Sequence, residues 1–302
     1  MFSVCVVGHL TRDIVSLGGQ ETEKPGGTAR YTALALKRLG ANVSVVTKLA
    51  AADEDELLLD FVEEDIPVHV GPSSSTTTFV HLYSEDANTR QEQVRDVASP
   101  FTVDDVVGID ADVFHLGPLN RNDIPLDVVE HLSARATVSI DVQGYLREVV
   151  SEIGGWRTLR YGPWAGIDSI LASTHILKAS AEEARIMSEN EEDLTAALAA
   201  RGPSEVIITR GSESSILYCE GPGGHGGHCI PSYQPETAIV DPTGCGDTFM
   251  AGYLHWRTRS SDAAKIGQFA AMTATLKLAG DGAFNGGEAD VLEFARKAGR
   301  PL

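Results

Sequence analysis

Short apolar segments alternate with helical patterns over most of the chain, and this alternation constrains the fold more than any other feature. Strands are predicted at residues 2–7, 42–47, 113–116, 137–140, 169–172 with 175–177, and 206–209. Helices are predicted at 29–39, 53–64, 125–132, 181–188 and 193–200, and after residue 241 at 245–257, 261–279 and 288–298. Such alternation indicates an α/β fold, a doubly wound and mainly parallel sheet with flanking helices.

Two regions interrupt the alternation. Residues 13–23 are short and of mixed polarity, and residues 68–94 include a run rich in β-branched and aromatic side chains at 76–83, which suits strands. Both predict a small β-sheet inserted into a single domain that spans residues 1–302. This appendage either closes over a substrate as a lid and excludes water, or stabilises a homodimer as a surface hairpin.

Composition narrows the functional classes. The formal net charge of −19 over 302 residues argues against nucleic acid as a partner, because phosphates would be repelled. A polyanionic substrate therefore needs a local positive site. No apolar stretch approaches the ~18 residues of a membrane span, and the first residues suit a buried strand better than a signal peptide. The four scattered cysteines favour a reduced cytoplasm.

The segment Asp241-Pro242-Thr243-Gly244-Cys245-Gly246-Asp247 leads into a helical pattern. Pro242 excludes a helix through the first part, and the two glycines permit a tight turn. Free N–H groups and the helix dipole then converge on an anion site. Asp247 is expected to accept a proton from an attacking hydroxyl rather than to bind phosphate. The alternative is a βα turn in which Asp247 caps the helix.

This segment resembles the C-terminal signature of the ribokinase-like (PfkB) carbohydrate kinases. The resemblance implies transfer of the γ-phosphoryl group of ATP, with Mg²⁺, to a hydroxyl of a sugar, a cyclitol such as inositol, or a nucleoside. It makes Asp247 the catalytic base and the N–H groups of Gly244, Cys245 and Gly246 the anion hole. Because Asp247 lies near a helix N-terminus, we expect it to stay ionised and to be a weak base.

The resemblance also places the acceptor and a cation. Asp13 and Gly26-Gly27 match the family's acceptor site, where Tyr31 replaces the usual asparagine. Asp141 and Gln143 follow a strand, so they either face the cleft or cap a strand end. Asp241 and Thr243 match positions that approach a monovalent cation such as K⁺, and Thr243 is also expected to contact the nucleotide.

Two further segments resemble the family's donor site. The run from Lys178 to Glu183 matches an N-x-x-E region with serine in place of asparagine. Glu183 would hold Mg²⁺ through water, or the run is a serine N-cap with acidic first-turn residues. Thr209-Arg210-Gly211 resembles a nucleotide contact, in which Arg210 neutralises phosphate or is a solvated loop arginine. Lys178, Thr209, Arg210 and Gly211 are therefore the nucleotide-binding candidates.

Two alternatives stay open. Substitutions at Tyr31, Ser180 and Ser214 leave room for a non-catalytic sugar- or nucleotide-binding protein on the same fold. A phosphosugar acceptor would need clustered cations, and the candidates Arg30, Arg90 and Arg95 are scattered.

Other chemistries find little support. The sequence contains no P-loop motif and no signature of a serine hydrolase or zinc peptidase. A zinc site would draw on Cys219, His225, His228 and Cys229. A glycine-rich hairpin loop is the better interpretation of that region.

Overall fold

The computed structural model describes residues 2–17, 20–83, 90–151, 157–188, 193–221 and 224–302. Its larger sheet has nine strands in the order β15-β14-β13-β12-β9-β8-β1-β4-β5. These strands are β1 (Ser3–Val7), β4 (Asn42–Ala50), β5 (Val68–Ser73), β8 (Val113–Leu116), β9 (Thr137–Asp141), β12 (Ile176–Ser180), β13 (Glu205–Thr209), β14 (Ser214–Gly221) and β15 (Gly224–Pro231). Neighbours from β5 to β13 are parallel, and β14 and β15 are antiparallel. The predicted doubly wound α/β fold is confirmed.

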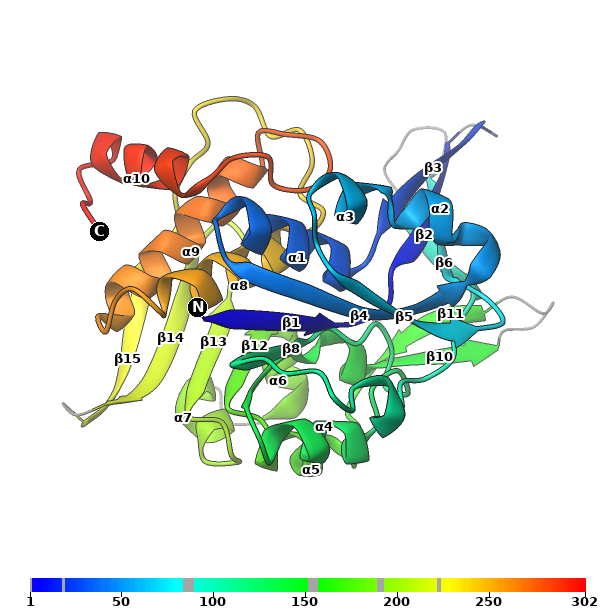
Figure 1. Ribbon diagram of the computed structural model, residues 1–302. Coiled ribbons are helices and arrows are strands. Elements are labelled where there is room, and N and C mark those ends of the chain that lie inside the picture. Colours follow the sequence, from blue (N-terminus) through cyan, green and yellow to red (C-terminus); the bar gives the residue numbers. More distant parts are fainter. Residues whose placement is uncertain (1, 18–19, 84–89, 152–156, 189–192, 222–223) are drawn as a thin grey trace.

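Helices cover both faces of this sheet (Figure 1). One face carries α1 (Thr28–Arg38), α8 (Cys245–Trp256), α9 (Ala263–Lys277) and α10 (Glu288–Lys297), and the other carries α4 (Leu126–Ser133), α5 (Ile167–Ala172), α6 (Ala181–Met187) and α7 (Leu194–Ala199). Alternation along β1 explains the two layers. Val4 and Val6 pack in the core under α1 and α8, whereas Cys5 and Val7 pack in the core under α4 and α5.

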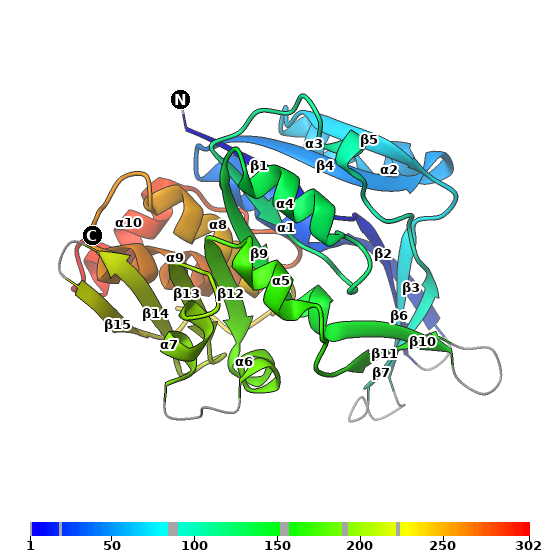
Figure 2. The same ribbon diagram turned by 90° about the horizontal axis from the view of Figure 1, so that it is seen from below.

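A second sheet of six strands stands at one side of the molecule (Figure 2). Its order is β10-β11-β7-β6-β2-β3. The strands are β2 (Thr11–Leu17), β3 (Gln20–Gly26), β6 (Thr77–Tyr83), β7 (Arg90–Asp96), β10 (Arg147–Ser151) and β11 (Arg157–Tyr161). A small apolar cluster of Phe79, Val94 and Leu119 joins this sheet to the body of the molecule. We call the six-stranded sheet the lid sheet.

The predicted boundaries of the appendage need correction. Residues 68–73 form β5, which pairs with β4 at the edge of the large sheet. The lid sheet also includes β10 and β11, which the sequence did not indicate because both are short and rich in polar residues. The Gly18-Gly19 turn and residues 84–89 lie outside the described residues.

Two helical predictions also change. Residues 169–172 belong to α5 and not to a strand, since Ile167, Ile170 and Leu171 recur at helical spacing and are buried. The helix predicted at 53–64 is divided into α2 (Glu54–Leu57) and α3 (Leu59–Glu63). Within the described ranges, no helix combines the length and the apolar character needed to cross a bilayer.

Candidate active site

The predicted site residues gather at the carboxyl edge of the large sheet. The parallel strands β9, β12 and β13 end there in Asp141, Ser180 and Thr209, and helices α1 and α8 begin there at their N-caps Gly27 and Gly244. Ligands of open α/β sheets bind at this edge. Two cavities lie on either side of the turn before α8. We call them the acceptor cavity and the donor cavity, after the roles that the family resemblance implies for the residues that line them.

The acceptor cavity has a volume of about 180 Å³ and lies between the lid sheet and the N-termini of α1 and α8. Its polar lining includes Asp13, Gln143, Arg147 and Asp247. Its apolar lining includes Tyr31, Phe79 and Leu119. The fold therefore brings the predicted residues Asp13, Gly27, Tyr31, Gln143 and Asp247 to one cavity, together with Thr243 and Gly244.

Gly27 lines this cavity, whereas Gly26 does not line it but packs against Asp13, which does. A Cβ at Gly26 would lie 2.2 Å from a carboxylate oxygen of Asp13, so the glycine makes room for that carboxylate. Gly27 has φ +97°, and a Cβ there would lie 2.4 Å from the carbonyl oxygen of His9. Asp13 accepts a hydrogen bond from Thr11 Oγ1 at 2.8 Å.

Asp247 is half-buried in the first turn of α8. The pKa of its carboxyl group is higher than expected. Burial and the nearby charge of Asp141 raise its pKa from 3.8 to about 7, although Lys178, a hydrogen bond from Thr28 and Arg147 act in the opposite direction. The prediction of an always ionised, weakly basic carboxylate is therefore wrong. Desolvation and a like charge outweigh the helix terminus.

Lys178 lies below the turn and is paired with Asp141. Its Nζ donates to Asp141 Oδ2 at 2.7 Å, and both side chains are buried. Burial disfavours the charged ammonium, but Asp141 and Glu183 together raise the pKa of Lys178. A Cβ at Gly246 would lie 3.0 Å from this Nζ, so the glycine lets the ammonium approach the turn. Lys178 thus provides a fixed positive charge in an acidic protein.

The backbone of the turn presents fewer free donors than predicted. Gly244 has φ +73° and is the N-cap of α8. The Cys245 N–H donates to the carbonyl oxygen of Pro242 at 3.3 Å, so the predicted free donor at Cys245 is already engaged. In the part of the chain that the structure describes, the N–H groups of Gly244 and Gly246 have no hydrogen-bond partner. These two remain available to an anion.

The donor cavity has a volume of about 420 Å³ and is mainly apolar. Tyr233, Ile239, Phe249, Ala274 and Leu278 supply apolar surface. Pro242, Cys245 and Gly246 form the wall next to the turn.

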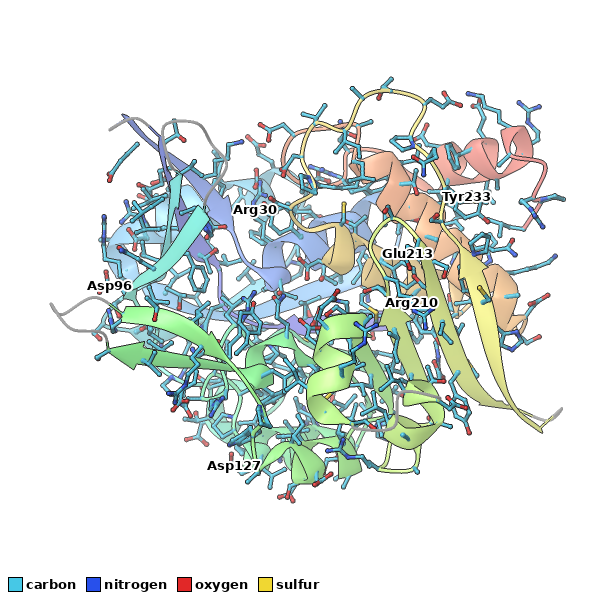
Figure 3. The ribbon with its side chains drawn as sticks, turned by 180° about the vertical axis from the view of Figure 1, so that it is seen from behind. Arg30, Asp96, Asp127, Arg210, Glu213 and Tyr233 are labelled. Atoms are coloured by element: carbon cyan, nitrogen blue, oxygen red, sulfur yellow. The ribbon has the colours of Figure 1, made fainter. Side chains whose placement is uncertain are left out.

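Two of the nucleotide-binding candidates line the donor cavity, Thr209 and Gly211, whereas Arg210, Lys178 and Thr243 do not. Arg210 is on the exposed connection between β13 and β14, where its carbonyl oxygen accepts from the Glu213 N–H (Figure 3).

Glu183 forms a capping box with Ser180. Ser180 N–H donates to Glu183 Oε2 at 2.7 Å, and Glu183 N–H donates to Ser180 Oγ at 3.2 Å. The structural interpretation of this segment is therefore confirmed. Among the described residues, no group of three or more His, Cys, Asp or Glu side chains is arranged to hold a metal ion. This search included Cys219, His228 and Cys229 of the zinc alternative, whereas the His225 side chain lies outside the described residues.

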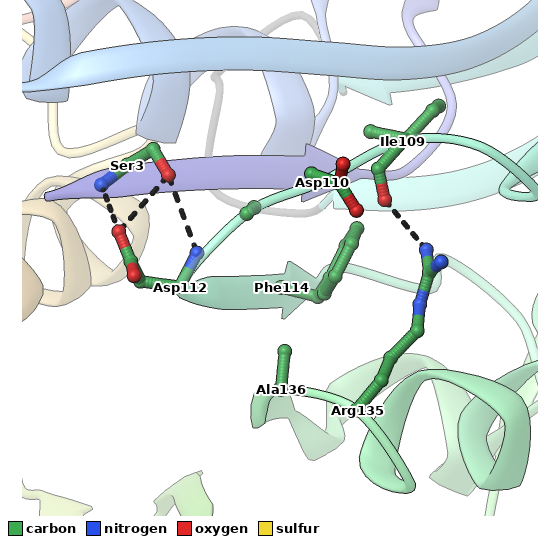
Figure 4. A pocket seen from close by; sticks show the side chains of 8 residues that line it. Ser3, Ile109, Asp110, Asp112, Phe114, Arg135 and Ala136 are labelled. Atoms are coloured by element: carbon green, nitrogen blue, oxygen red, sulfur yellow. Dashed lines mark hydrogen bonds between the residues drawn. The ribbon is translucent and has the colours of Figure 1, made fainter.

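A third hollow lies at the opposite edge of the sheet, at the beginnings of β1, β8 and β9 (Figure 4). Asp112 accepts from the Ser3 N–H at 2.7 Å, and Arg135 donates to the Ile109 carbonyl at 2.6 Å. These polar groups satisfy one another, and none of the predicted site residues lines this hollow.

Several site residues escaped the sequence analysis. Arg147 begins β10 and lines the acceptor cavity together with Thr28, whose side chain acts to lower the pKa of Asp247. Phe79 lies in the run at 76–83, which predicted only a strand, and Leu119 follows the strand predicted at 113–116. Lys277, the last residue of α9, contacts Asp241: its Nζ donates a hydrogen bond to the Asp241 carbonyl oxygen at 2.6 Å. A lysine at the end of a predicted helix gives no signal of such a contact, because lysine is common at helix C-termini.

Comparison with known proteins agrees with this geometry. The model of the pfkB family carbohydrate kinases matches residues 1–288. A cytidine kinase of Thermococcus kodakarensis is 28% identical over 262 residues, which are 84% of this chain and 88% of the relative. An inositol 3-kinase of Oryza sativa subsp. japonica is 27% identical over 284 residues, 87% of this chain and 66% of that longer protein.

Solved structures share the fold. A pyrophosphate-dependent kinase in the ribokinase family, complexed with a pyrophosphate analog and myo-inositol, has a TM-score of 0.81 at 22% identity and covers 96% of this chain and 99% of its own. The nucleoside kinase of Methanocaldococcus jannaschii has a TM-score of 0.79 at 19% identity, covering 98% and 99%.

Fold, site and relatives define a phosphotransferase with an alcohol group as acceptor. The family match extends over almost the whole chain. The protein belongs to the pfkB family of carbohydrate kinases.

Proposed function

We propose that the protein transfers the γ-phosphoryl group of ATP to a hydroxyl of a small, neutral polyhydroxy acceptor. The observation that carries this proposal is the position of the 242–247 turn between the two cavities. Asp247 and Gly244 line the acceptor cavity, while Cys245 and Gly246 line the donor cavity. A phosphoryl group that passes from one cavity to the other would therefore meet the turn and the start of α8.

Each chemical step has a residue suited to it. Asp247, with a pKa of about 7, accepts the proton of the attacking hydroxyl near neutral pH. The N–H groups of Gly244 and Gly246, with the ammonium of Lys178, stabilise negative charge on the transferring group. Asp141 keeps Lys178 in place. A loose transition state needs mainly this positioning and charge stabilisation.

The donor cavity suits a nucleotide. Its apolar surface from Tyr233, Ile239 and Leu278 would bind a base, and its wall at Gly246 leads to the turn where phosphates would lie. Mg²⁺ would bind together with the phosphates, and Glu183 would hold it through water. Glu183 Oε2 also accepts the hydrogen bond from the Ser180 N–H in the capping box. When bound, this ion neutralises charge on the phosphates.

The acceptor cavity is smaller than the ~300–1,000 Å³ typical of drug-sized ligands, which favours a single sugar or cyclitol ring over a larger molecule. Asp13 and Gln143 are suited to its hydroxyls, and the family relatives extend the candidates to nucleosides. Among the residues that the structure describes, Arg147 is the one arginine that lines the cavity. Arg30 is paired with Asp60, with Nε 2.7 Å from Oδ2, so a phosphosugar is the second choice.

The lid sheet supplies Asp13, Phe79 and Arg147 to the acceptor cavity, which supports a role in covering the acceptor. A homodimer through this sheet stays a prediction.

The direct test is ATP consumption, coupled to ADP detection, against a panel of hexoses, pentoses, inositols and nucleosides with Mg²⁺. We expect turnover with at least one neutral acceptor and none when acceptor is omitted. Pyrophosphate replaces ATP in a parallel series as a control for the donor. ATP binding without turnover on any acceptor would favour the non-catalytic binding protein.

The pH dependence tests Asp247 as the base. Its carboxyl group must be ionised to accept a proton, so kcat/KM should rise with pH through about 7 and then level off. If the rate were instead flat between pH 5 and 8, no group with this pKa would be required. Rates measured at constant ionic strength, with a check that the coupling enzymes are not limiting, give the profile.

The donor cavity is tested by filling it. Ala274→Phe should raise the KM for ATP by about 10-fold or more, because the ring would occupy space that the base needs. Its effect on the KM of the acceptor should be small. Ala298→Phe, at the exposed end of α10, is the matched control and should behave as wild type. Equal KM values for the two variants would argue against this location of the base.

A further inference from the structure

A buried ammonium group is bound to the residue that begins the signature turn. Lys277 is 1% exposed, and its Nζ donates to the carbonyl oxygen of Asp241 at 2.6 Å. The same Nζ is 3.4 Å from Asp241 Oδ2. Lys277 ends α9, whose C-terminal carbonyls favour a cation. A charge this deeply buried must be compensated, and Asp241 compensates it with two oxygens.

Asp241 in turn fixes the turn and the following loop. Its Oδ1 accepts from the Thr243 N–H at 2.8 Å, and its Oδ2 accepts from the Gly282 N–H at 3.3 Å. Next to it, the Val240 N–H donates to the Leu278 carbonyl at 2.8 Å. Lys277 and Asp241 therefore connect the end of α9 to the backbone immediately before Gly244.

The charge of Lys277 also affects the pKa of Cys245 within the turn. Burial raises the pKa of the Cys245 thiol to about 11, and Lys277 acts against this rise by favouring the thiolate. Asp241 is held ionised: burial would raise its pKa, but the hydrogen bonds from Thr243 and the charge of Lys277 keep it below 3.8.

A monovalent metal ion does not fit the same place. Such an ion would need the carbonyl and carboxylate oxygens of Asp241, and both already face the Lys277 ammonium. A second cation at those oxygens would be repelled by the first at close range. The expected K⁺ site at Asp241 is thus occupied by a side chain.

We propose that the Lys277 ammonium is a built-in cation that holds Asp241 and the Gly244–Gly246 turn, so that phosphoryl transfer does not depend on K⁺. Lys277 acts as a positioning residue, since it lines neither cavity. The inference rests on the proposed kinase activity, because only the turn's role in transfer makes its position matter for rate.

The first experiment exchanges the monovalent cation. The wild-type protein is dialysed against tetramethylammonium chloride, and kcat is measured with KCl, NaCl or tetramethylammonium chloride at equal ionic strength. We expect the same kcat in all three. A fall of about 10-fold or more in tetramethylammonium, the scale of a lost site interaction, would overturn the proposal.

The second experiment removes the ammonium in two ways. Lys277→Ala leaves space and should lower kcat by about 10- to 100-fold, with recovery on addition of KCl or NH₄Cl but not tetramethylammonium chloride. Lys277→Met fills the space and should lose activity without recovery. A merely structural lysine would show a loss that no cation restores in either variant. Lys297→Met, an exposed lysine on α10, is the control.

If no acceptor is turned over, binding still decides the question. The Kd of ATP with Mg²⁺, and the melting temperature, are measured in KCl and in tetramethylammonium chloride. Wild type should show no difference between the salts, whereas Lys277→Ala should bind and melt better in KCl. Failure of the acceptor panel would then count against the proposed function alone. A potassium-dependent wild-type Kd would count against the built-in cation.

Discussion

Replacing Asp247 by asparagine is expected to lower kcat by about 10²- to 10⁴-fold, because the amide cannot accept the proton of the attacking hydroxyl. The KM for ATP should change little, since Asp247 lines the acceptor cavity and not the donor cavity. Lys178 and the Gly244–Gly246 turn remain in place in this variant. Single-turnover measurements with saturating ATP separate the chemical step from product release.

The Asp247→Asn variant should lose activity but gain stability at high pH. This combination distinguishes a loss of chemistry from misfolding. The Asp247 pKa is 3.8 in an unfolded chain and about 7 in the native protein. Between these values the native state holds the proton more strongly, so stability falls as pH rises from about 4 to about 7. Asparagine removes this loss. In thermal unfolding at pH 5 and pH 8, the melting temperature of the variant relative to wild type should be higher at pH 8 than at pH 5.

The matched control is Asp127→Asn on α4, an exposed carboxylate far from the turn (Figure 3). It should keep wild-type kcat and pH dependence. An Asp247→Asn protein that is folded and retains wild-type kcat would mean that another group, or water alone, accepts the proton.

The fold could be predicted because its strongest signals are local. Strands such as β1, β8 and β13 are mainly apolar, since both faces of a parallel sheet are covered. The helices between them follow the 3.6-residue period. Parallel order then places the ends of β9 and β12 at the same edge, so Asp141 and Lys178 meet although 37 residues separate them.

The rest of the site depends on distances that local patterns do not encode. The pKa of Asp247 is set by burial and by Asp141, which comes from a distant strand. Arg147 reaches the acceptor cavity because β10 pairs with β11 in the lid sheet, and neither polar strand was predictable. The Lys277 contact needs the packing of α9 against the segment before the turn.

Tyr31 and Gly244 show how a substitution at one family position acts on another. Gly244 has φ +73°, which only glycine adopts without strain. A Cβ there would lie 2.4 Å from Cγ and Cδ1 of the Tyr31 ring. The tyrosine that replaces the family's asparagine thus lies directly against the turn before α8 and also lines the acceptor cavity.

Gly244→Ala should therefore lower both stability and kcat more than an ordinary glycine substitution does. Left-handed backbone alone costs about 1–2 kcal/mol for an alanine, and contact with the Tyr31 ring must displace either the ring or the turn. Since an error of about 1 Å in a reacting group can cost 10²-fold in rate, we expect kcat to fall by about that factor. Gly108→Ala is the control, because Gly108 has φ +79° and nothing within 4 Å of its Cβ position.

The double variant Tyr31→Ala/Gly244→Ala tests the contact itself. If the ring and the new methyl group collide, removing the ring should relieve part of the damage, so the two losses of unfolding free energy should sum to more than the loss in the double variant. Left-handed strain would persist, and stability should approach that of Gly108→Ala combined with Tyr31→Ala. Strictly additive losses would mean that the turn accommodates the methyl group in the same way whether or not the Tyr31 ring is present, so the two groups would not be in contact.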